Sequence, residues 1–168
     1  MAAPPDDFEA LCRQEYPRLV GALSLYTGDR EVAEDLAQES LARAWTRWRQ
    51  VSEADNPAAW LFVVDYNLAK SHVRRLRIET RARFHLSTPD RQSEADPAET
   101  ADVKRALAAL PHRYRSVLVL RYYLGLSLGE ISTHLNVPLS TVKTWSARGL
   151  ERLREDGLYE LKEALDVI

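Results

Sequence analysis

Hydroxyl-bearing and cationic side chains gather near the start of a predicted helix in the C-terminal third of the chain. They are Ser140, Thr141, Lys143, Thr144 and Arg148, with Trp145 on the flank of the same stripe. Hydroxyls and cations at such a position can bond the base edges in a DNA major groove, and a helix N-terminus attracts phosphate. The stripe predicts a nucleic-acid contact, against the alternative of a solvated face. Trp145 fits either a surface-covering role or a contact with DNA.

The residues around this stripe predict a helix-turn-helix. A capping box at Ser127 and Glu130 starts a helix over 128–135, and Asn136 tolerates the left-handed backbone of the following turn. A second helix is expected over 139–155, capped by Ser140 or Thr141. Its inner face would be formed by Val142, Ser146, Gly149, Leu150 and Leu153.

A second cluster of cations is interleaved with aromatic residues in the first half of the chain. The cations are Lys70, Arg74, Arg75, Arg77, Arg81 and Arg83, and the rings are Trp60, Tyr66 and His72. Cations with aromatic rings suit phosphate contact and base stacking on opened strands. A solvated helix end is the alternative.

An acidic stripe precedes that cluster. Glu31, Asp35 and Glu39 lie four residues apart, joined by Glu34 and Gln38, and like charges at this spacing repel one another. Acids early in a helix complement its dipole, which explains part of the pattern. A basic protein partner explains the stripe more fully.

The hydrophobic pattern divides the chain into two helical blocks, residues 1–86 and 103–168, so an all-α fold of two small domains is expected. Between them, residues 87–102 contain five acids, one arginine and two prolines, with almost no apolar bulk. Such a segment cannot bury enough surface to fold alone and is predicted to be a flexible linker. A surface loop inside one domain is the alternative.

In the first block an opening helix, or a helix pair, is expected with a break or first-turn position at Pro17. A helix follows from an N-cap at Asp29 to Trp48, and residues 50–55 read as a polar loop. The next helix begins at Asn56-Pro57 and continues to about Arg77, with Leu61, Val64 and Leu68 inward.

In the second block, helices are expected from Val103 to Leu110 and over 114–123, separated by Pro111. After Gly157 a short amphipathic tail should pack back on the block. The leucine- and alanine-rich composition favours helix throughout.

Charge and composition exclude several functions. The chain has 168 residues and a formal net charge of −2, so a DNA reader of this composition is not expected to bind DNA unaided.

Cys12, the single cysteine, is interpreted as a core thiol. The four histidines have no metal-ligand spacing, and no nucleophile motif or glycine-rich phosphate loop occurs. We therefore expect no enzyme activity, cofactor, metal or small-molecule substrate, no membrane insertion, and a cytoplasmic location.

Three separated motifs are similar to those of the bacterial extracytoplasmic-function (ECF) sigma factors of the sigma-70 family. They are AEDLAQESLARAW, NPAAWLFVVDYNLAKSHVRR and LPHRYRSVLVLRYYLGLSLGEISTHLNVPLSTVKTWSARGLERLR, in that order. The resemblance covers nearly all of both blocks. It implies a sigma2 domain and a sigma4 domain that bind core RNA polymerase, recognise the −10 and −35 promoter elements and help to open the strands.

The resemblance also implies residue roles. The stripe of Glu31, Asp35, Gln38 and Glu39 would dock on the polymerase clamp, and residues 117–123 would contact the flap. The −10 element would meet Asn56, Trp60, Tyr66, Asn67, Lys70, Arg74 and Arg75. The −35 element would meet Ser140, Thr141, Lys143, Thr144, Trp145 and Arg148. An anti-sigma factor is expected to hold the free, monomeric protein inactive.

This sequence departs from the family pattern at Asp65-Tyr66, at His72-Val73 and at Trp145. The first departure affects the expected −10 contacts, and Trp145 affects the −35 preference. A stand-alone transcription regulator is the rival interpretation; it predicts a dimer with tight operator binding and leaves the first block unexplained.

Overall fold

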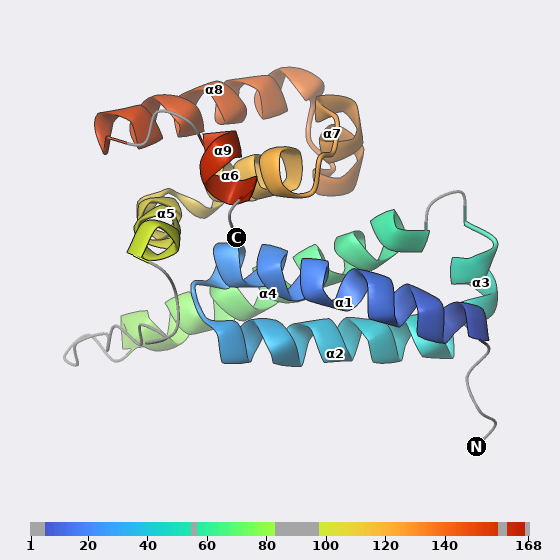
Figure 1. The fold of residues 1–168 in the computed structure, drawn as a ribbon. Helices are drawn as coiled ribbons and strands as arrows, with labels where there is room; N and C mark the ends of the chain where they lie inside the picture. Colours follow the sequence, from blue (N-terminus) through green and yellow to red (C-terminus); the bar gives the residue numbers. More distant parts are fainter. Residues whose placement is uncertain (1–5, 55–56, 83–97, 158–160, 167–168) are drawn as a thin grey trace. The chain divides into compact units, whose positions relative to one another are not determined.

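The computed structural model describes residues 6–54, 57–82, 98–157 and 161–166, and the regular elements in these ranges are all helices. The chain divides into two compact units, unit 1 (residues 1–91) and unit 2 (residues 92–168) (Figure 1). No helix in the described ranges has both the length and the apolar character that crossing a bilayer requires. The all-α expectation is confirmed.

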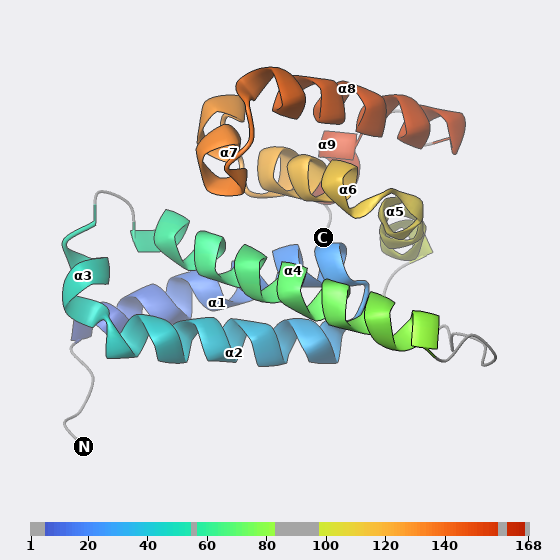
Figure 2. The ribbon, with the colours of Figure 1, turned by 180° about the vertical axis from the view of Figure 1, so that it is seen from behind.

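Unit 1 is built on three long helices that pack against one another. They are α1 (Asp6–Thr27), α2 (Arg30–Thr46) and α4 (Pro57–Ala82), and the short α3 (Trp48–Ser52) joins the last two (Figures 1 and 2). Asp29 caps α2 as predicted, because its carboxylate accepts a hydrogen bond of 3.2 Å from the Val32 amide. Pro57 is the first residue of α4, the position that its fixed φ suits.

The core of unit 1 combines leucines of α1 with alanines of α2. Leu19, Leu23 and Leu25 of α1 and Ala33 and Ala37 of α2 are all at most 3% exposed, and α1 packs against α2. Alanine allows the three helices to approach closely, and burial of the leucines stabilises their packing.

Three expectations for unit 1 were wrong in detail. Pro17 lies inside a continuous α1 instead of breaking it, since Leu19 and Leu23 hold the helix on the buried side while Pro17 faces solvent. α3 extends into the predicted polar loop, and its Val51 is fully buried. The helix expected to end near Arg77 continues to Ala82.

The inner face of α4 also differs from the expectation. Leu61 is fully buried, but Val64 and Leu68 are only half-buried, and Phe62 and Asp65 are buried in their place. α4 packs against both α1 and α2, so the line between these two neighbours decides which side of α4 faces inward.

The described residues of unit 2 form six helical segments. They are α5 (Ala98–Ala109), α6 (His112–Leu118), the π-helix η1 (Val119–Tyr123), α7 (Leu128–Leu135), α8 (Leu139–Glu155) and α9 (Leu161–Asp166) (Figure 1). The bounds predicted for α7 and α8 are confirmed. α5 begins at Ala98, inside the predicted linker, and residues 87–97 lie outside the described ranges.

The helix predicted over 114–123 changes geometry at its midpoint. α6 continues into η1, where the Leu124 amide bonds the Val119 carbonyl at 3.1 Å, five residues back. The tail packs back as expected, because Leu161 and Leu165 of α9 are buried and α9 contacts α5 and η1.

Asp65 is an acid enclosed in the core of unit 1. It is 2% exposed, and neither carboxyl oxygen has a hydrogen-bond partner. Burial raises the pKa of this carboxyl to about 7, and the nearby Ser40 hydroxyl offsets only part of that shift. The folded protein therefore retains a proton that the unfolded chain releases above about pH 4.

This retained proton makes stability depend on pH. Because the folded state binds more protons than the unfolded state, the contribution of Asp65 to the free energy of unfolding falls between about pH 4 and pH 7. The full decrease amounts to roughly 4 kcal/mol. Asp65→Asn should match the wild type near pH 3.5, below the pKa of the unfolded chain, and exceed its stability at pH 8, as measured by urea denaturation. Asp35→Asn controls for the loss of a surface acid; a constant difference between Asp65→Asn and wild type across this range would contradict the assignment.

Candidate functional site

The turn between α7 and α8 is held by local hydrogen bonds that the sequence predicts in part. The Ser127 hydroxyl accepts from the Glu130 amide at 3.2 Å, and the Glu130 carboxylate accepts from the Ser127 amide at 2.8 Å. These bonds lower the pKa of Glu130. Asn136 adopts the expected left-handed backbone, with φ 53°, and the Ser132 hydroxyl donates to the Val137 carbonyl at 2.7 Å. The capping box and the turn residue are confirmed.

The inner face of α8 packs directly on α6. Val142, Ser146, Gly149 and Leu153 are buried as predicted, and Leu150 is half-buried. A Cβ at Gly149 would lie 2.9 Å from Leu118 Cδ1 and 3.3 Å from Tyr114 Cβ. The absence of a side chain at Gly149 therefore sets how closely α8 approaches α6, and with it which face of α8 points outward.

The outward face of α8 presents the predicted polar stripe. Ser140, Lys143, Thr144 and Arg148 are exposed, and Thr141 and Trp145 are half-buried on its flanks. The expected cap was wrong: the N-cap is Pro138, so Ser140 and Thr141 lie within the first turn and no side chain accepts from the first-turn amides. An uncapped helix end beside hydroxyls and cations is suited to phosphate and base-edge contacts.

Sequence reasoning missed the surroundings of Tyr114, where α6 passes beneath α8. The Arg113 guanidinium carbon lies 5.0 Å from the centre of the Tyr114 ring, and that of Arg152 lies 5.5 Å away. Hydrogen bonds to Arg113 and to Arg148 lower the pKa of the Tyr114 hydroxyl. The spacing of Arg148 and Arg152 along one helix is visible in the sequence, but the proximity of Arg113 is a tertiary feature.

On unit 1, the four acidic-stripe residues Glu31, Asp35, Gln38 and Glu39 are all exposed on α2. They lie away from the buried line of Ala33, Ala37, Ser40 and Ala44. Glu39 forms a hydrogen-bonded ion pair of 2.5 Å with Arg43, whereas Glu31 and Asp35 form no ion pair among the described residues. The structure brings these predicted residues together on one surface.

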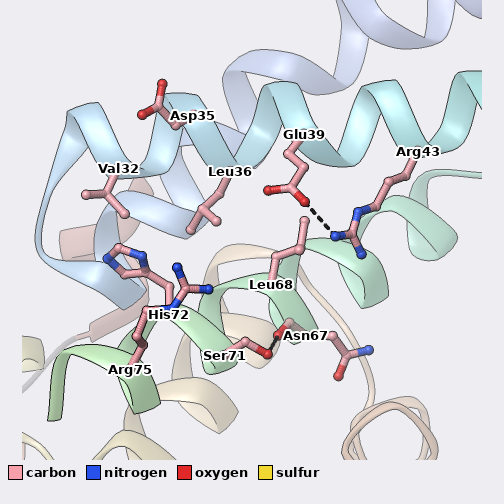
Figure 3. A pocket seen from close by; sticks show the side chains of 10 residues that line it. All are labelled: Val32, Asp35, Leu36, Glu39, Arg43, Asn67, Leu68, Ser71, His72 and Arg75. Atoms are coloured by element: carbon pink, nitrogen blue, oxygen red, sulfur yellow. Dashed lines mark hydrogen bonds and ion pairs between the residues drawn. The ribbon is translucent and has the colours of Figure 1, made fainter. Parts of the chain in front are cut away.

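A cavity of about 460 Å³ lies between α2 and α4 (Figure 3). Its wall on α2 is formed by Val32, Asp35, Leu36, Glu39 and Arg43, and its wall on α4 by Asn67, Leu68, Ser71, His72 and Arg75. Leu36 and Leu68 extend into the space between the two helices (Figure 3). The cavity joins residues from the predicted acidic stripe to residues from the predicted −10 group, so one rim is acidic and the other basic.

The predicted −10 residues of α4 share one exposed side. Asn67, Lys70, Arg74 and Arg75 are exposed, and Trp60, at the start of the same side, is half-buried. Tyr66 is half-buried against Tyr26, with ring centres 5.6 Å apart, so part of its surface packs on the core. Asn56 lies outside the described residues, as do the side chains of Arg77, Arg81 and Arg83.

Cys12 and the side chains that could bind a metal are the remaining groups of chemical interest. Cys12 is half-buried, not a core residue, and burial raises the pKa of its thiol. Within the described ranges, no three or more His, Cys, Asp or Glu side chains are close enough together to hold a metal ion.

Comparisons with known proteins match both units. The Sigma-70 region 2 model matches residues 11–78, and the model for Sigma-70, region 4 matches residues 100–153. The ECF RNA polymerase sigma factor SigL of Mycobacterium tuberculosis is 33% identical over 145 residues, covering 80% of this chain and 82% of SigL. SigW of Bacillus subtilis, also an ECF RNA polymerase sigma factor, is 31% identical over 143 residues, covering 76% of each chain.

The fold is shared with a solved structure. The sigma factor RpoE of Bartonella quintana, in complex with the anti-sigma factor NepR, matches with a TM-score of 0.76. The match covers 90% of this chain and 96% of that one at 24% identity, a level at which the likeness concerns the fold.

The close packing at Gly149 generates a prediction for unit 2. Gly149→Ala should destabilise this unit by about 1–3 kcal/mol, because the added methyl group overlaps Leu118 and crowds Tyr114. Gly129→Ala on α7 is the matched control, since its Cβ would lie 3.9 Å from Ser127 Oγ and alanine favours the helix. Urea denaturation, with the units fitted as separate transitions, measures both. Equal effects of the two substitutions would rule out a special role for Gly149.

Proposed function

Because the chain belongs to the ECF sigma factors of bacterial RNA polymerase, in the sigma-70 family, we propose that the surfaces described above perform that family's function here. A sigma factor binds core RNA polymerase, recognises promoter elements and promotes transcription initiation. What remains to be assigned is which residues of this chain make each contact. The proposal divides the contacts between the two units, with residues 1–86 as the sigma2 domain and 103–168 as the sigma4 domain.

The outward face of α8 is proposed to contact the −35 element. The capped α7, the left-handed Asn136 and the Gly149 contact together hold α8 with its polar N-terminal half toward solvent. A helix presented in this way enters a major groove with its first residues toward the base edges. Lys143, Thr144 and Arg148 are then the residues directed to bases, and Ser140, Thr141 and Trp145 lie beside them.

The exposed side of α4 is proposed to meet the −10 element. Asn67, Lys70 and Arg74 supply polar and cationic groups along one line, and Trp60 supplies a partly exposed ring on which a base can stack. Asn56, Tyr66 and Arg75 complete the set. The buried Asp65 takes no direct part, because its carboxyl faces the core.

The acidic stripe of α2 is proposed to dock on the polymerase clamp, and the region of η1 on the flap. Exposed carboxylates at Glu31 and Asp35 suit a basic protein surface, and Gln38 and Glu39 widen the contact. Charge complementarity of this kind steers association and fixes the orientation of the partners.

Attachment of both units to one polymerase explains how a chain with an acidic net charge can recognise DNA. Each cationic patch alone neutralises few phosphates, so each unit alone binds DNA weakly. Holding both patches on one enzyme raises the effective concentration of each at the promoter. The free chain is monomeric and cytoplasmic in this proposal, without catalytic activity or a small-molecule ligand. In this proposal an anti-sigma factor binds the free chain and restrains it; the similarly folded RpoE is known in complex with the anti-sigma factor NepR.

Transcription in vitro tests the function. Core polymerase supplemented with the purified chain should initiate at discrete sites on genomic DNA of the source bacterium, and mapped start sites should share −35 and −10 sequences. Core polymerase alone is the control. Tight, sequence-selective DNA binding by the isolated chain, without stimulation of the polymerase, would identify a stand-alone regulator instead.

The acidic stripe generates a prediction for core binding. Replacing Asp35 and Glu39 together by alanine should weaken binding to core polymerase by about tenfold or more, because interface charge pairs contribute on the order of 1.4 kcal/mol or more. The fold should persist, since both side chains are exposed and the Glu39–Arg43 pair is a surface ion pair.

A matched double variant separates the effect of position from the effect of net charge. Asp7→Ala combined with Glu9→Ala removes two exposed acids from α1 and changes the net charge equally. Fluorescence anisotropy of labelled chain with core polymerase measures both double variants. If they bind equally well, the stripe is not the docking surface.

A further inference from the structure

Three arginines of unit 2 converge on one buried tyrosine at the seam between α6 and α8. Tyr114 is 3% exposed, and its Cβ lies 3.3 Å from the position that a Cβ on Gly149 would take. From α8, Arg148 hydrogen-bonds the Tyr114 hydroxyl. Arg113 approaches from α6, with Nη2 3.4 Å from the Tyr114 hydroxyl oxygen and its guanidinium carbon 5.0 Å from the ring centre. Arg152 lies 5.5 Å from the same ring centre. One side chain thus organises three cations from two helices.

The positive charge of this cluster is not balanced within the part of unit 2 that the structure describes. Other arginines have carboxylate partners, such as Arg105 with Asp102 at 2.9 Å and Arg30 with Glu34 at 2.9 Å. Among described residues, Arg113, Arg148 and Arg152 form no ion pair, although Glu151 and Glu155 lie nearby along α8. Arg148 and Arg152 are one helical turn apart, where like charges repel. An anion bound among them would relieve that repulsion.

The contacts with Tyr114 leave these guanidinium groups suited to phosphate. A guanidinium that lies over an aromatic ring uses its face, and its N–H edges remain available to two oxygens of one phosphate. The ring and its hydroxyl also restrict the arginine side chains, which reduces the entropy lost when a ligand orders them. All three arginines are exposed, so the cluster is accessible to a ligand from solvent.

The position of the cluster along α8 indicates which phosphate it meets. The first residues of a helix in the major groove face bases, and residues further along approach the strand that borders the groove. Arg148 lies two turns into α8, Arg152 lies a turn further, and Arg113 adds a contact from a second helix.

We propose that Arg113, Arg148 and Arg152, gathered around Tyr114, form a binding site for a backbone phosphate of the DNA duplex beside the −35 element. This site rests on the proposed function, and it adds Arg113 and Arg152 as contacts that position the duplex without reading its sequence. Arg148 then has two neighbours on the DNA, a base edge and the bordering phosphate.

The salt dependence of promoter binding tests this site. Holoenzyme reconstituted with Arg113→Ala or Arg152→Ala should bind a promoter duplex, taken from the mapped start sites, with a slope of log K against log salt reduced by about 1. The reduction should be the same on duplexes with altered −35 bases, because a phosphate carries no sequence information. Arg152→Lys, which keeps the charge, should retain the slope while binding more weakly than arginine.

Arg154→Ala provides the matched control, since Arg154 is an exposed arginine of α8 that does not contact Tyr114. Slopes for Arg113→Ala and Arg152→Ala equal to that of Arg154→Ala would overturn the phosphate site. Weakened binding to core polymerase without DNA, at an unchanged slope, would overturn it in favour of a protein contact. Failure of the wild-type holoenzyme to transcribe would instead refute the proposed function, so the two failures are distinguishable.

Discussion

The close approach of α8 to α6 at Gly149 is the constraint on which the outward surface of unit 2 depends. With a hydrogen in place of a side chain, α8 packs against Leu118 and Tyr114, and Val142 and Leu153 are buried on either side of that contact. Burying this line turns the opposite line of hydroxyls and cations to solvent. The same contact positions Tyr114 under α8 and so brings arginines of two helices together. The packing of α8 and the chemistry of its outward face therefore both follow from this buried line, which Gly149 allows to approach α6.

In unit 1, alanines on α2 allow close helix packing as Gly149 does in unit 2, because their small side chains let α1 and α4 approach. The inner side of α4, however, contains Asp65, a carboxyl group that apolar packing would not require. Keeping this group protonated avoids a buried charge but leaves its polar atoms without partners, which is a cost in stability. The remaining sides of α2 and α4 are free to carry opposite charges, and the cavity between them has an acidic rim and a basic rim.

The arrangement of charge explains how a chain with a net charge of −2 belongs to a family that works on DNA. Cations are concentrated on α4 and α8, and acids on α2, so the average charge describes none of these surfaces. Local clusters decide which molecule each surface can attract, and in the proposed function attachment to the polymerase supplies the affinity that the small patches lack. In the Tyr114 cluster, an aromatic side chain organises cations without neutralising them.

The sequence by itself determined the helical class, the division into two units, the capping box, the left-handed turn at Asn136 and the bounds of α7 and α8. These features depend on local chemistry: hydrogen bonds between residues a few positions apart, and the backbone preferences of Asn, Pro and Gly. Only the tertiary structure decided that Pro17 stays within a helix, that Val51 is buried and that Asp65, not Val64, faces the core. It also decided that Arg113 of α6 and Arg152 of α8 both lie over the ring of Tyr114. Each of these outcomes depends on which neighbouring helix packs against the residue. Such a contact joins segments that are far apart in the chain, and a local sequence pattern does not determine which segments meet.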